Sequence, residues 1–159
     1  MDINVRKADA EVRRAYGYDE LLILLRYHPL MMTRVTFLDC GDQKYGRGEL
    51  HAELDIAANY VRAMANTNLA SPCEQGLAFY LHQVLAIQAS ARTHLVCESV
   101  SFRGDVPIPD DREFLGIWVD IQRLDVNTRY ADAYASGRVG YSRAKPLVQV
   151  RDLVVRIEV

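Results

Sequence analysis

SPCEQGLAFYLHQVLAIQASA, residues 71–91, predicts one long helix that the rest of the chain must enclose. Ser71 suits the N-cap, Pro72 the first helical position and Glu74 the third, which together form a strong helix start signal. Beyond this start, apolar side chains point in almost every direction around the helical period and leave no wide polar face. They are Leu77, Ala78, Phe79, Tyr80, Leu81, Val84, Leu85, Ala86 and Ile87.

Length and composition fit one domain covering residues 1–159. Half of the residues are hydrophobic (50%) and the net charge is −2, so we expect no general affinity for nucleic acid or anionic membranes. Cys40, Cys73 and Cys97 form no CxxC pair, so we expect neither a disulfide framework nor a zinc knuckle. We see no signal peptide and no run long enough to cross a membrane, which favours a cytoplasmic protein.

No cofactor or metal is predicted. The histidines at positions 28, 51 and 94 show neither HxxH nor HExxH spacing, so we do not expect a histidine metal site.

Around the central helix, β-branched and alternating segments predict strands, and residues 1–26 predict an N-terminal helical segment. The predicted strands are 33–38, 47–54, 94–102, 114–124, 130–139 and 153–159. In the fifth strand, Ala131, Ala133 and Ala135 share one face, which lets the central helix approach closely. One helix wrapped by long antiparallel strands is the α+β hotdog arrangement.

Parts of the chain resemble hydroxyacyl carrier-protein dehydratases, which are hotdog proteins. Residues 18–35, from YDELL through RYHPLMMTRV, are similar to the opening helix and first strand of these dehydratases. Residues 102–110 are similar to the strand and proline loop that follow the central helix of the dehydratases. The resemblance implies a loop histidine as base and a helix carboxylate as acid. This chain has Ala65-Asn66-Thr67-Asn68 near the loop and Leu81 at the carboxylate position, so dehydration by the standard pair is disfavoured.

A closer resemblance is to the FcoT-type long-chain fatty-acyl-CoA thioesterases. Tyr27 and Tyr60 match family tyrosines with the same spacing, and Tyr60-Val61-Arg62 is similar to a family Tyr-Ile-Arg. Asn68 falls at a family asparagine, and Leu81-His82-Gln83 lines up with Phe-Asn-Gln. The sequence departs from the family in a longer loop between Asn68 and Glu74, and in His82 at an amide position.

This resemblance implies a site for a thioester carbonyl at the first turn of the helix. The backbone N–H groups of Cys73, Glu74, Gln75 and Gly76 would face the developing oxyanion. Tyr60 and Tyr27 would donate hydrogen bonds to that oxygen or to the attacking water. Asn68 would orient the water or the carbonyl. His82 would activate the water or protonate the leaving thiolate.

Simpler interpretations of these residues stay open. A lone histidine inside an apolar helix is more often a hydrogen-bonded core residue than a base, and only the resemblance favours a catalytic role for His82. Ser71 and Glu74 are consistent with simple helix-capping residues. Cys73 is more consistent with a buried packing residue than with a nucleophile. Each tyrosine taken singly fits the core or a dimer interface.

We therefore expect a homodimer or higher homo-oligomer that hydrolyses fatty-acyl thioesters of CoA or acyl carrier protein. One alternative is the addition of an amine such as glycine to an α,β-unsaturated acyl thioester. Another is a non-catalytic or dehydratase-like subunit that only binds such thioesters. The fifth strand, with Tyr130, Asp132 and Tyr134, is also a candidate wall of an acyl tunnel.

Overall fold

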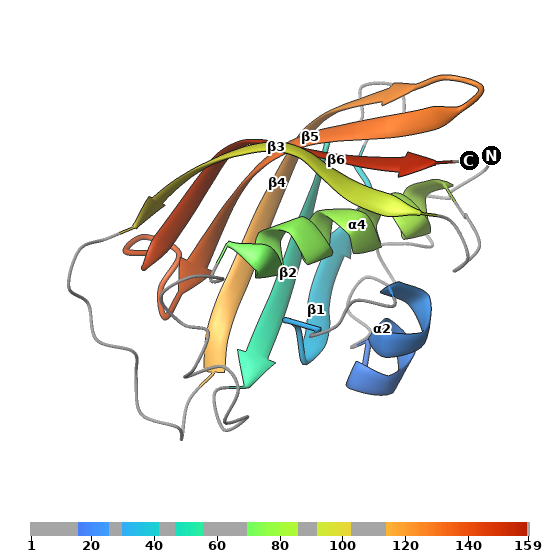
Figure 1. Cartoon of the computed structure of the whole chain (residues 1–159). Coiled ribbons are helices and arrows are strands. Elements are labelled where there is room, and N and C mark those ends of the chain that lie inside the picture. The colour runs from blue at the N-terminus through green and yellow to red at the C-terminus, as the bar shows by residue number, and fades with distance from the viewer. Residues whose placement is uncertain are drawn as a thin grey trace.

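Helix α4 (Ser71–Leu85) lies in the hollow of a curved six-stranded sheet (Figure 1). The computed structural model shown there describes residues 16–25, 30–41, 47–55, 70–85, 92–102 and 114–158. Only Ser71, Glu74, Gln83 and Leu85 of the helix are not buried. The predicted enclosure of the helix is therefore confirmed, while its predicted continuation over 86–91 lies outside the described residues.

All neighbouring strands of the sheet run antiparallel, in the order β1-β2-β4-β5-β6-β3. The strands are β1 (Arg34–Asp39), β2 (Gly48–Asp55), β3 (Thr93–Phe102), β4 (Phe114–Val126), β5 (Tyr130–Gly140) and β6 (Val148–Glu158). A short helix, α2 (Tyr18–Leu25), packs on α4. The six predicted strands and the α+β class are confirmed. No helix among the described residues is both long and apolar enough to span a membrane.

Strand β6 begins earlier than predicted because its alternation is interrupted. Val148 and Val150 face the core, and so do Leu153, Val155 and Ile157. Between them Asp152 has φ 50°, and the extra residue reverses which positions point inward. Sequence alternation therefore marked only the second half of the strand.

The face of β5 that carries the alanines packs on α4, as predicted. Ala131, Ala133 and Ala135 are 0–1% exposed. Further along the same face is Gly137, where a Cβ atom would lie 2.5 Å from the Sγ of Cys73. Small residues thus let the helix approach the sheet as closely as its backbone allows.

The tyrosines of β5 lie on the opposite, outer face, so they do not face the helix. Asp132 accepts two hydrogen bonds from Arg156, at 2.7 and 2.9 Å, and the guanidinium of Arg156 lies 3.7 Å from the ring centre of Tyr130. Arg123 covers Tyr134 in the same way at 3.9 Å. Tyr130, Asp132 and Tyr134 therefore face away from α4, as their alternation with the alanines predicts. The suggestion that their strand borders an acyl tunnel stays a prediction.

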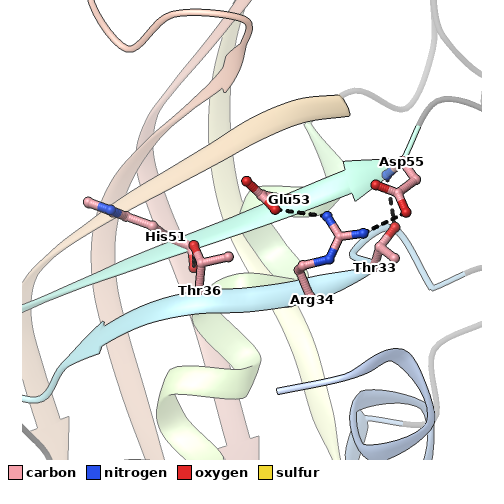
Figure 2. A network of polar contacts seen from close by, with 6 residues as sticks. All are labelled: Thr33, Arg34, Thr36, His51, Glu53 and Asp55. Carbon is pink, nitrogen blue, oxygen red and sulfur yellow. Dashed lines mark hydrogen bonds and ion pairs between the residues drawn. The ribbon is translucent and has the colours of Figure 1, made fainter. Parts of the chain in front are cut away.

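A polar network fixes the outer edge of the sheet at β1 and β2 (Figure 2). Arg34 bridges Glu53 and Asp55 at 2.8 and 2.6 Å, and the backbone N–H of Asp55 donates to the hydroxyl of Thr33. The pKa of Arg34 is raised, chiefly by its hydrogen bond to Glu53. These groups are part-exposed, so they set the register of the two strands more than they add stability.

Tyr80 fastens the middle of α4 to the loop between β1 and β2. Its hydroxyl donates to the carbonyl oxygen of Cys40 at 3.2 Å, and burial raises its pKa, so it stays a neutral donor. A Cβ at Gly48 would lie 2.5 Å from the hydroxyl oxygen, which explains the glycine there.

Gly137→Ala is expected to lower the free energy of unfolding by about 1–3 kcal/mol, because the new methyl group would overlap the thiol of Cys73. Urea denaturation measures the loss. Gly17→Ala is the matched control, since no heavy atom lies within 4 Å of its Cβ position. Adding Cys73→Ala removes the overlapping sulfur and should recover part of the loss. Unchanged stability in Gly137→Ala would contradict this packing.

Candidate active site

The structure describes only part of the predicted site. Tyr27, Tyr60 and Asn68 lie in the segments 26–29 and 56–69, outside the described residues. The other predicted residues all belong to α4: its first turns carry Cys73 to Gly76 and its last turn carries His82.

Fewer backbone donors are available at the start of α4 than the sequence suggested. Pro72 has no N–H group, and the N–H of Cys73 donates to the carbonyl of Ala70 at 3.1 Å. From Gln75 onward the N–H groups bond within the helix, each to the carbonyl four residues earlier. Donors for an oxyanion are therefore confined to the very start of the helix.

Cys73 is a packing residue in this structure. Its side chain is fully buried against Gly137, and desolvation raises the pKa of its thiol, which therefore stays protonated. This agrees with the interpretation of Cys73 as core filler.

Gln75 and Gly76 also serve the core. The Oε1 atom of Gln75, a residue only 3% exposed, accepts a hydrogen bond of 2.6 Å from the backbone N–H of Met31. A Cβ at Gly76 would lie 3.1 Å from Leu50 and 3.2 Å from Val119. The missing side chain at Gly76 thus lets β2 and β4 approach the helix closely.

Glu74 is the one carboxyl group of the first turn. It is partly buried, and its pKa is raised, first by desolvation and then by the negative charge of Glu98 on β3. The sequence pattern indicated a capping role for Glu74, and it did not indicate that Glu98 acts on this residue. The charge of Glu98 acts on Glu74 because β3 returns to the far edge of the sheet beside β6, a pairing that no local sequence spacing reveals.

His82 lies further along the helix. It is 3% exposed and follows Gly76 by six residues, which corresponds to about 9 Å along the axis. A thioester carbonyl held at the start of α4 would therefore lie too far from the helix backbone at His82 for direct contact. The imidazole side chain of His82, or a water molecule between the two, would have to bridge the distance.

Metal ligands are not gathered in the described part of the chain, where no group of three or more His, Cys, Asp or Glu side chains could hold an ion.

No protein-family model and no curated protein sequence matches the chain. Among solved structures, it is similar to a protein from Silicibacter sp. TM1040 assigned as a thioesterase, with 11% identity, a TM-score of 0.56 and coverage of 90% of this chain and 91% of that one. It is also similar to the dehydratase heterocomplex ApeI:P from Xenorhabdus doucetiae, with 14% identity, a TM-score of 0.57 and coverage of 85% and 88%.

At these sequence identities, the structural similarity is evidence for the fold alone. The order of the strands, the enclosed helix and the two structural neighbours agree with one another. The chain is a hotdog-fold protein.

Proposed function

We propose that the protein hydrolyses fatty-acyl thioesters, carried by CoA or by acyl carrier protein, at the N-terminal end of α4. The observation that carries this proposal is Glu74, a partly buried carboxylate kept at the start of an enclosed helix. Ionisable groups held in such surroundings concentrate at functional sites. The assignment of the Silicibacter neighbour as a thioesterase supports the same reaction class.

In the proposed reaction, water attacks the carbonyl carbon of the thioester and the carbon–sulfur bond then breaks. Tyr60 and Tyr27 donate hydrogen bonds to the carbonyl oxygen as it gains negative charge, and Asn68 orients the water. His82 takes the proton of the water and gives it to the departing thiolate. The products are a free acid and a thiol, so protons and electrons balance without a cofactor.

We also propose that the enzyme works in the cytoplasm as a homo-oligomer. The neighbouring dehydratase is a heterocomplex, so association is compatible with the fold.

Release of thiol from acyl-CoA esters of several chain lengths tests the reaction. We expect Tyr60→Phe and His82→Asn each to lower kcat by about 100-fold, since each removes a group that acts on the transition state. His82→Asn supplies the amide of the FcoT-type pattern, which cannot transfer protons, and keeps more of the side-chain volume than alanine.

His51→Asn is the matched control, because His51 lies against Phe37 on the outer face of the sheet, with ring centres 4.8 Å apart. It should leave kcat unchanged. Full activity in His82→Asn would exclude proton transfer by His82. Tight binding of acyl-CoA without any thiol release would overturn hydrolysis in favour of a binding subunit.

Glu74 gives a prediction about stability and pH. Because its folded pKa is raised above the ordinary 4.5, the folded state holds more protons than the unfolded state between the two values. The wild type therefore loses stability as the pH rises through this window. Glu74→Gln cannot ionise, so its Tm should exceed that of the wild type at pH 7, and the gain should disappear below pH 4.5.

Thermal denaturation across this pH range provides the measurement. Glu98→Gln should give a smaller gain, because the charge of Glu98 is the second cause of the raised pKa and desolvation the first. An equal gain for Glu74→Gln at pH 4 and pH 7 would contradict the argument.

A further inference from the structure

Three carboxylates form a row across the outer face of the sheet. Asp39 on β1 pairs with Glu49 on β2, and Glu49 pairs with Asp120 on β4. Residues that lie directly opposite each other on neighbouring strands share a face, and here the buried residues that alternate with them face α4. Like charges placed directly opposite each other are destabilising, so this carboxylate row requires a positive charge nearby.

Arg143 supplies that positive charge from outside the strands. It belongs to residues 141–147, which join β5 to β6 and are called the β5–β6 loop below. Its guanidinium lies 2.7 Å from Glu49 and 3.1 Å from Asp120, so one side chain bridges two carboxylates of the row. The carbonyl oxygen of Arg143 also accepts a hydrogen bond of 3.1 Å from Arg138 of β5. Both the backbone and the side chain of Arg143 are therefore held on the outer face.

Glu49 lies at the centre of these contacts. The Oε1 atom that meets Arg143 also lies 2.7 Å from the Nε2 atom of His51. Burial raises the pKa of Glu49, but the hydrogen bonds from His51 and Arg143 outweigh this effect and bring the pKa below its ordinary value of 4.5. Glu49 is therefore ionised at neutral pH and attracts the guanidinium.

The two ends of the β5–β6 loop are held in different ways. Near β6, Pro146 and Leu147 are buried, and the backbone N–H of Leu147 donates to the carbonyl of Val139 at 2.8 Å. Residues 141–145 are exposed, and the side chains of Arg143, Glu49 and Asp120 are 42%, 31% and 45% exposed. Ion pairs as exposed as these are weakened by salt. The loop thus has one firmly packed end and one part that is held by ion pairs open to the solvent.

We propose that the contacts of Arg143 with Glu49 and Asp120 form an ionic lock that holds residues 141–145 against the outer face. The loop then has two states. In the closed state Arg143 bridges the two carboxylates, and in the open state residues 141–145 leave the sheet and the carboxylate row faces water. Ionic strength shifts the balance between the states, because it weakens the ion pairs of the closed state alone. The lock lies on the face opposite α4, so it does not depend on the proposed thioester site.

Hydrogen exchange of the backbone amides of residues 142–145 tests the lock. Arg143→Gln removes the charge and should speed this exchange about fivefold, since the closed state loses both ion pairs. In the wild type, about 1 M NaCl should speed the exchange in the same way, whereas Arg143→Gln should not respond to salt. Unchanged exchange in Arg143→Gln would overturn the proposal.

Arg123→Gln is the matched control for the exchange measurement. Arg123 is also an arginine of the outer face, and it contacts the exposed carboxylate of Asp125 at 3.2 Å. It pairs with Tyr134, toward the turn between β4 and β5 and away from the β5–β6 loop. Its removal should leave the exchange of residues 142–145 unchanged.

Thermal denaturation of a double-mutant cycle tests whether Arg143 holds the carboxylates. In the wild type, Asp120→Asn should lower the Tm, because Arg143 loses one of its two partners. In the Arg143→Gln background the same change should raise the Tm, because it removes a carboxylate that lies unscreened opposite Glu49. Equal changes of Tm in the two backgrounds would contradict the ionic lock.

Discussion

The enclosure of α4 is the constraint on which the rest of the structure depends. A helix that is apolar all around is stable in water only if other elements cover it on every side. The sheet meets this need by curving around the helix and by offering small residues where the two come closest, at Ala131, Ala133, Ala135 and Gly137. The few polar groups drawn inside, such as Gln75 and the hydroxyl of Tyr80, have hydrogen bonds to backbone atoms.

The same enclosure limits what the helix can contribute to chemistry. Most of its first turns are used for packing: Cys73 fills space against Gly137, and Gln75 holds the backbone of Met31. Glu74 escapes full burial, but desolvation and the negative charge of Glu98 still raise its pKa. This carboxylate is the feature on which the proposed thioester site rests.

Much of the fold could be predicted because its signals are local. Helix start residues, alternation in β4 and β5, and the alanine face of β5 each lie within one element. Prediction failed where the pattern was broken or non-local. Asp152, with φ 50°, reverses the alternation within β6 and hid the first half of that strand. The proximity of Glu74 to Glu98 depends on the order of strands in the sheet, which one sequence does not display. The roles of Tyr27, Tyr60 and Asn68 stay predictions.

The packing of Gly137 against Cys73 links two positions that are far apart in the sequence. A Cβ atom at position 137 would lie 2.5 Å from the sulfur, so residue 137 can gain volume only where residue 73 loses it. The two positions are therefore expected to vary together among related chains, while a change at one of them alone is disfavoured.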